Sequence, residues 1–195
     1  MKKILLSILL CLICSCSLIC QEGKIRLSNI KTAGLLIEYG SPYYYLPEGI
    51  RYYVVPVGAN FSFPLFKAKP DKHFNMSVDL YPHHVFVSVD GDRSDYEFGL
   101  NVRLGLNYSF SDNDLLSFKL ASGPHYITVD TEKQAKGFIF SDYYLFCYRK
   151  LLNNGQHPFV LEFEFGYRHI SNGWIKEPNR SISNFIFGLG FSREF

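Results

Sequence analysis

Apolar and polar residues alternate with a period of two along most of the chain beyond residue 30. In residues 96–110 every even position is apolar or aromatic, while the odd positions carry small, polar or charged residues. This pattern is typical of a β-strand with one apolar and one polar face. The run is long for a strand of a soluble sandwich, whereas a strand that crosses a bilayer needs about 9–11 residues.

Eight such segments follow one another, and no long helical period lies between them. They are residues 32–40, 51–65, 73–89, 94–110, 114–129, 136–149, 158–171 and 181–195. Pro56 and Pro64 weaken the second segment, and we expect Pro82 to end or bulge the third. Eight alternating segments of this length predict an all-β fold, an eight-stranded antiparallel transmembrane β-barrel of the outer membrane.

The links between the segments differ in length. Residues 111–114 and 153–156 are short turn sequences, whereas the links at 40–50 and 172–180 are longer. Short turns at one end and longer loops at the other are typical of outer-membrane barrels. The last segment alternates as far as Phe195, which resembles the C-terminal signal of such barrels.

A short basic region and an apolar run open the chain. They predict a secretory signal peptide over residues 1–20 and a single barrel domain over residues 21–195, because the run is too short to favour a membrane-spanning helix. Two leader types stay open: a plain cut near Cys20, or a lipoprotein-type leader with Cys16 lipidated. Four of the five cysteines lie in the leader. Only Cys147 remains, so we expect no disulfide and no cysteine metal site.

Composition narrows the choice of partners. Removing Lys2 and Lys3 with the leader leaves 18 of the 20 basic residues, against 18 acidic ones. Such a nearly neutral chain argues against nucleic acid as a partner. Aromatic residues make up 17% of the chain, and the girdles of a membrane barrel would use them. We therefore expect a membrane-embedded protein without a cofactor, and its oligomeric state is left open.

A histidine and a serine stand at the end of the seventh segment. Alternation places His169 and Ser171 on one face, roughly 7 Å apart at Cα. A base and a hydroxyl so placed can form an activated serine nucleophile. The other odd positions of the segment are apolar, so this face is expected to meet lipid. The even positions then point into the barrel: Glu162, Glu164 and Arg168.

The number of strands predicts how deep in the membrane His169 and Ser171 lie. A barrel with an even number of strands and both termini in the periplasm sends its seventh strand outward. His169 and Ser171 then lie near the outer rim, and residues 172–180 form an external loop. A nucleophile on the lipid side suits an ester of an outer-leaflet lipid and does not suit a soluble metabolite.

Residues 169–173, His-Ile-Ser-Asn-Gly, followed by Pro178-Asn179, resemble the His-x-Ser-Asn…Pro-Asn signature of the outer-membrane lipid A 3-O-deacylases, the PagL-like acyloxyacyl hydrolase family. The resemblance implies hydrolysis of the 3-O-linked hydroxyacyl chain of lipid A, the membrane anchor of lipopolysaccharide. It implies Ser171 as the nucleophile and His169 as the base. Asn172 and Asn179 lie where side chains would help to hold the oxyanion.

Two positions depart from the family pattern. A known member of the family has a glutamate fourteen residues after the histidine, and this chain has Ser183 there. Parity still places Ser183 on the face of His169, which makes it the candidate third catalytic residue. Glu177 is the nearest acidic alternative, but it lies in the loop. Trp174 replaces a small residue, and it would either anchor the loop at the membrane interface or obstruct an acyl groove.

Other interpretations stay open for each of these residues. His169 and Ser171 would be a polar pair at the membrane interface, Asn172 and Asn179 would form a turn, and Ser183 would be a plain interface serine. The chain would then be a small non-enzymatic barrel with an adhesive or structural role. A catalytically weakened relative is the third hypothesis, since the carboxylate is missing.

Histidines and loop cations complete the candidate chemistry. His83, His84 and His125 have no third ligand at a suitable spacing, so we interpret them as rim or lumen residues and predict no metal site. Cations in the expected external loops would either contact the phosphates of lipid A or be solvated: Lys133, Lys136, Lys176 and Arg180.

Overall fold

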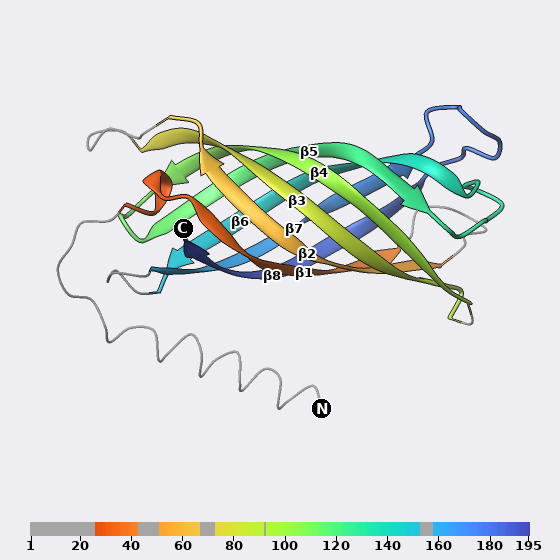
Figure 1. Cartoon of the computed structure of the whole chain (residues 1–195), viewed down its shortest axis with the longest axis horizontal. Helices are drawn as coiled ribbons and strands as arrows, with labels where there is room; N and C mark the ends of the chain where they lie inside the picture. Colours follow the sequence, from red (N-terminus) through yellow and green to blue (C-terminus); the bar gives the residue numbers. More distant parts are fainter. Residues whose placement is uncertain (1–25, 43–50, 67–72, 92, 153–157) are drawn as a thin grey trace.

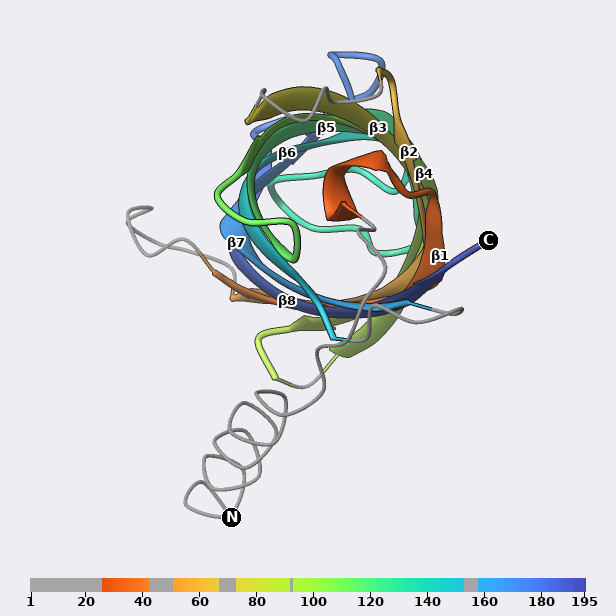
Figure 2. The same ribbon diagram turned by 90° about the vertical axis from the view of Figure 1, so that its left-hand side faces the viewer.

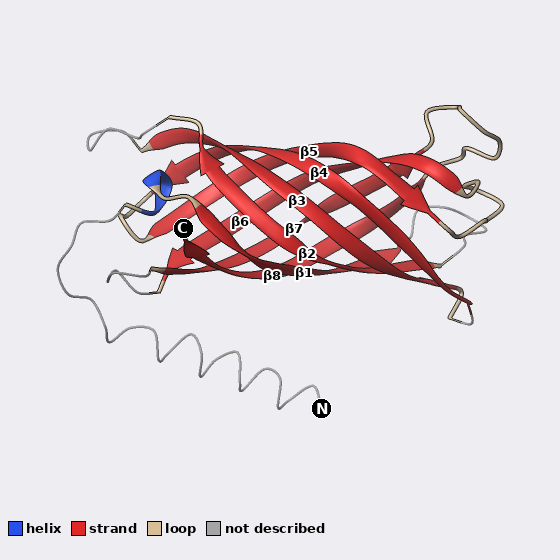
Figure 3. Ribbon diagram, viewed as in Figure 1, coloured by secondary structure: helices blue, strands red, loops and turns tan. Residues whose placement is uncertain are grey.

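The computed structural model describes residues 26–42, 51–66, 73–91, 93–152 and 158–195, and the expected signal peptide at residues 1–20 lies outside them. The described residues form eight strands and a short 3-10 helix, η2 (Leu27–Asn29) (Figure 3). The strands are β1 (Thr32–Pro42), β2 (Tyr52–Pro64), β3 (Phe74–Val89), β4 (Arg93–Ser109), β5 (Asp114–Ile127), β6 (Gly137–Leu151), β7 (Phe159–Ser171) and β8 (Ile182–Glu194). No described helix is long and apolar enough to cross a membrane.

The eight strands close into an antiparallel barrel (Figures 1 and 2). Each strand pairs with its neighbours in sequence, and β8 completes the ring by pairing with β1. Closure leaves no open sheet edge, so the backbone polar groups of the strands are satisfied without water. The observed strands coincide closely with the eight predicted segments, and the predicted fold class is confirmed.

Two details differ from the sequence-based expectation. β3 neither ends nor bulges at Pro82, because the β2–β3 register is the same on both sides of it. The missing N–H of proline removes a local hydrogen bond without displacing the strand. The end of the barrel that is expected to carry only longer loops also has a short turn. A tight turn at Asp90 and Gly91, both with positive φ, joins β3 to β4 at the end that carries the β7–β8 loop.

Paired charges and a buried apolar cluster share the inside of the barrel. Arg103 binds Glu38 at 2.9 Å and Glu164 at 3.1 Å, and all three side chains are fully buried. The other buried cations are paired too: Lys119 with Asp79 and Glu162, Arg149 with Glu162, and Arg168 with Glu97. The inward direction predicted for the even positions of β7 is therefore confirmed. A barrel of eight strands has room for such packed side chains but not for a wide channel.

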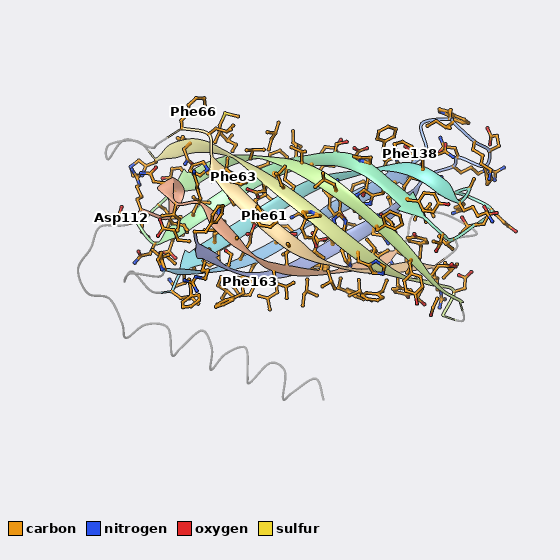
Figure 4. All side chains as sticks on the ribbon, in the orientation of Figure 1. Phe61, Phe63, Phe66, Asp112, Phe138 and Phe163 are labelled. Atoms are coloured by element: carbon orange, nitrogen blue, oxygen red, sulfur yellow. The ribbon has the colours of Figure 1, made fainter. Side chains whose placement is uncertain are left out.

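The outer surface carries the apolar half of the alternation (Figure 4). Phe66 and Phe138, both labelled in Figure 4, are 68% and 45% exposed. η2 lies inside the ring of strands, at the barrel mouth on the side of the C-terminus (Figure 2). There Asn75 donates a hydrogen bond to the carbonyl of Ser28 at 2.6 Å, and Leu27 packs in a buried apolar cluster with Leu115. η2 thus packs against the inside of this end of the barrel.

Replacing Arg103 tests the importance of the buried charge network. Arg103→Ala leaves the carboxylates of Glu38 and Glu164 buried without their shared cation. Because removing one partner of a buried pair costs about 3–5 kcal/mol, we expect the free energy of unfolding to fall by that amount. Urea unfolding of the purified barrel in lipid vesicles, followed by far-ultraviolet circular dichroism, measures it.

The control is Arg180→Ala, which removes an exposed arginine from the β7–β8 loop. This change should alter the free energy of unfolding by less than about 0.5 kcal/mol. A loss in Arg103→Ala no greater than in this control would contradict the stabilising role of the Arg103 pairs.

Candidate active site

His169 and Ser171 lie on the outer face of β7, at the end of the strand that leads into the β7–β8 loop. Both side chains are half-buried, whereas the alternating Arg168 and Ile170 are fully buried inside the barrel. This loop lies at the end of the barrel opposite the C-terminus (Figure 1). Strand parity and strand order therefore place the pair as predicted, on the outside and near one rim.

β8 brings Ser183 to His169. The two residues are direct cross-strand partners, and Nδ1 of His169 lies 3.2 Å from Oγ of Ser183. The hydroxyl of Tyr167 donates a hydrogen bond to the same Oγ at 2.5 Å. Nδ1 is thus engaged by Ser183, which leaves Nε2 of His169 for the reaction.

Tyr167 is a member of this cluster that the sequence analysis does not single out. Its only signal is its position two residues before His169, on the same face of the strand. The apolar alternation of β7 hides it, because a tyrosine ring fits the lipid-facing pattern as well as phenylalanine does.

His169 and Ser171 share a face but are not hydrogen-bonded. Among the described residues, no hydrogen bond joins the two side chains. Their Cα atoms are roughly 7 Å apart, as for any two residues one position removed on a strand face. A general base acts at about 2.6–3.2 Å, and this contact is often longer before substrate binds.

Asn172 and Asn179 hold the β7–β8 loop. The side-chain oxygen of Asn179 accepts a hydrogen bond from the backbone N–H of Asn172 at 3.0 Å. Nδ2 of Asn172 donates to the carbonyl of Lys176 at 2.5 Å. Asn172 is 1% exposed and Asn179 7%. The amide of Asn172 is therefore engaged within the loop, in line with the turn-forming interpretation.

The β5–β6 connection braces this loop from the side. Gln134 pairs with Asn179 in an isolated bridge, and the backbone N–H of Arg180 donates to the carbonyl of Lys133 at 2.7 Å. The bracing brings cations of two loops to one rim. Three of these predicted loop cations are exposed: Lys136, Lys176 and Arg180.

Trp174 lies at an exposed part of the same loop. Its side chain is 75% exposed, and that of the following Ile175 is 66% exposed. Large apolar side chains so open to their surroundings fit the interface-anchor interpretation of Trp174 better than obstruction of a groove.

A possible metal-ligating group lies inside the barrel. Within the described parts of the chain, Cys147, Glu162 and Glu164 offer ligand atoms within 4.8 Å of one another. Arg103 already binds Glu164 and Lys119 already binds Glu162, so cationic side chains take the place of an ion. Two histidines also face the lumen, His83 at 6% and His125 at 3% exposure.

A large apolar hollow indents the outer face below the site. Its volume is about 620 Å³, and side chains from six strands line it. They include Phe74, Leu106, Phe118, Phe146, Phe165 and Phe187. Phe165 and Phe187 continue the outer faces of the two strands that carry His169 and Ser183. The polar cluster thus stands at one end of a surface suited to an aliphatic chain.

Comparison with known proteins adds a family to this geometry. A family model described as lipid A 3-O-deacylase (PagL) matches residues 55–192. No curated protein matches the chain. The structure is similar to a solved structure titled "Crystal structure of the outer membrane enzyme PagL", with a TM-score of 0.57 and 12% identity, over 80% of this chain and 97% of that one.

The outer membrane protein OprG from Pseudomonas aeruginosa is a second similar structure, with a TM-score of 0.45 and 11% identity, over 89% of this chain and 99% of that one. The likeness to PagL concerns the fold, whereas the family model covers most of the chain and every candidate site residue. The chain therefore belongs to the lipid A 3-O-deacylase (PagL) family.

Proposed function

We propose that this protein is a serine esterase that hydrolyses the 3-O-linked hydroxyacyl chain of lipid A. The observation that carries the proposal is the position of His169 and Ser171, side by side on the outer face of the barrel of a family member. Polar side chains that face lipid are energetically costly, so their presence there indicates a functional site. Lipid esters reach this face directly, and soluble metabolites do not.

The barrel is an outer-membrane protein. With the start of β1 and the end of β8 on the periplasmic side, β7 runs outward and the β7–β8 loop is external. His169 and Ser171 then lie at the level of the outer leaflet, near its interface. Lipid A is the lipid of that leaflet in lipopolysaccharide, which makes it the partner that the site would meet.

The chemistry follows from the two side chains. Oγ of Ser171 attacks the ester carbonyl, and Nε2 of His169 accepts the hydroxyl proton as the new C–O bond forms. The tetrahedral intermediate collapses, and His169 returns the proton to the departing sugar hydroxyl. A water molecule, activated by the same base, then releases the hydroxyacyl chain from Ser171. Ser183 accepts a hydrogen bond from Nδ1–H and so holds the reactive tautomer.

Further contacts would position the substrate. The released chain would lie along the apolar hollow that Phe165 and Phe187 line. The cations of the braced loops, Lys133 and Arg180 among them, would meet the phosphates of lipid A. Nδ2 of Asn172 is engaged by Lys176, whereas Nδ2 of Asn179 donates no hydrogen bond within the described residues and would hold the oxyanion, a contribution of roughly 3–4 kcal/mol when preorganised. The reaction calls on no cofactor.

Removing the nucleophile tests the proposal. We expect Ser171→Ala to lower the rate of 3-O-deacylation by at least about a thousandfold, because the acyl intermediate forms on the hydroxyl that this change removes. Mass spectrometry of lipid A from cells that express the chain reads out the loss of one hydroxyacyl group. Ser94→Ala is the matched control, since Ser94 is an exposed serine on the outer face of β4.

The control variant should deacylate at the wild-type rate. If the wild-type barrel is folded and lipid A keeps its acyl pattern, the esterase proposal fails. The hypothesis of a non-enzymatic barrel would then hold.

Ser183 can be tested as an orienting residue. Ser183→Ala removes the partner of Nδ1 of His169. We expect kcat to fall about tenfold with KM unchanged, since this hydrogen bond orients the base and does not touch substrate. Steady-state deacylation of lipid A in mixed micelles by the purified barrel gives both constants. Tyr167→Phe removes only the donor to the same Oγ and should change kcat by less than about threefold.

An unchanged kcat in Ser183→Ala would show that Ser183 is a plain interface serine.

A further inference from the structure

A row of polar side chains crosses the apolar outer face at the level of His169. The strand register pairs Ser122 of β5 with Asp142 of β6, Asp142 with His169 of β7, and His169 with Ser183 of β8. Aromatic residues flank this row on the outer faces of β6, β7 and β8: Phe140, Tyr144, Tyr167 and Phe185. Ser171 extends the polar group by one outward position of β7, so the polar residues of these strands gather at the level of the candidate site.

Asp142 is a carboxylate without a partner in the described part of the chain. No hydrogen bond or ion pair of Asp142 is present there. The carboxylates inside the barrel behave differently, as Glu164 shows by its bond to Arg103 at 3.1 Å. A carboxylate on the lipid side is costly unless a positive charge meets it. Asp142 therefore needs a nearby group that can become positively charged.

His169 is the group that fits this requirement. Directly opposite residues on antiparallel strands have Cβ atoms about 4.5–5.5 Å apart, which allows an aspartate and an imidazole to meet. The titratable groups that face His169 are Asp142 and Tyr144 from β6 and Tyr167 from its own strand, while β8 offers only Ser183. On the described outer faces of β6, β7 and β8, Asp142 is the one carboxylate.

Loop charges do not replace it. The exposed Lys176, Glu177 and Arg180 lie beyond the ends of β7 and β8. Ser183 is neutral, so it orients Nδ1 without neutralising the imidazolium that forms when Ser171 loses its proton. The charge that stabilises this imidazolium has to come from another strand.

We infer that Asp142 is a positioning residue that stabilises protonated His169 from β6, a catalytic role that rests on the proposed function. Ser183 orients the ring from β8, and Asp142 supplies the negative charge from the opposite side. The carboxylate also lines the edge of a second hollow of about 420 Å³ between β4, β5 and β6. Its surroundings there are the apolar side chains of Leu104 and Leu120, which screen its charge less than water would.

The ring signals of His169 test the pairing without any need for turnover. The full barrel is labelled with ¹⁵N-histidine in lipid nanodiscs, and the His169 signals are identified by their loss in His169→Gln. Because Asp142 stands directly opposite His169, Asp142→Asn should shift the ring ¹⁵N signals of His169. Glu177→Gln, which removes an exposed loop carboxylate, should leave them in place.

Kinetics then test the role in catalysis. We expect Asp142→Asn to lower kcat by about tenfold to a hundredfold with KM unchanged. Adding Ser183→Glu to Asp142→Asn should restore most of the rate, since it places a carboxylate on the other side of the same ring.

The outcomes separate this inference from the proposed function. Ring ¹⁵N signals of His169 that do not move in Asp142→Asn overturn the pairing, even if the wild-type enzyme is active. A change confined to KM would assign Asp142 to substrate contact and also overturn it. If the signals move as expected but the wild-type barrel releases no hydroxyacyl chain, the pairing stands and the proposed function fails.

Discussion

A closed sheet in hydrocarbon leaves each side chain only two directions, outward to lipid or inward to the lumen. Closure through the β1–β8 pair satisfies the backbone, and the period of two then sorts the whole sequence between two solvents. Inward positions carry apolar side chains and also charges, which are tolerated because they are paired, as Arg103 is with Glu38 and Glu164. Outward positions are apolar. Any polar residue on the outside therefore departs from the rule that holds the barrel in the membrane.

The candidate site consists of such outward polar residues, and the register of three strands brings them next to one another. β6, β7 and β8 are held by continuous ladders, so Asp142, His169 and Ser183 face one another at fixed positions. A slip of one residue in either ladder would send a whole strand's apolar face into the lumen. The forces that fix the barrel thus fix the site as well, without a loop having to carry the reacting groups.

The sequence alone predicts the strands, the two faces and the family, because these depend on local alternation and on a short motif. It does not predict which residues stand opposite each other, since register is set by closure of the whole ring. Asp142 shows the difference. Its break in the apolar alternation of residues 136–149 is visible in the sequence, but its pairing with His169 appears only with the β6–β7 register. Tyr167 and the bracing of the β7–β8 loop by Lys133 escape for the same reason.

A serine at position 183 in place of a carboxylate is compatible with a catalytic function. A third catalytic residue has two separable tasks, to orient the imidazole and to stabilise its positive charge. Orientation needs a hydrogen-bond acceptor at Nδ1, and Ser183 provides one at 3.2 Å. Stabilisation needs a nearby negative charge in a medium of low dielectric constant, and a neighbouring strand on either side can supply it equally well. Every strand of a closed barrel has two neighbours, and β7 lies between β6 and β8. The absence of a carboxylate from β8 therefore does not by itself make the chain a weakened relative, because β6 presents Asp142.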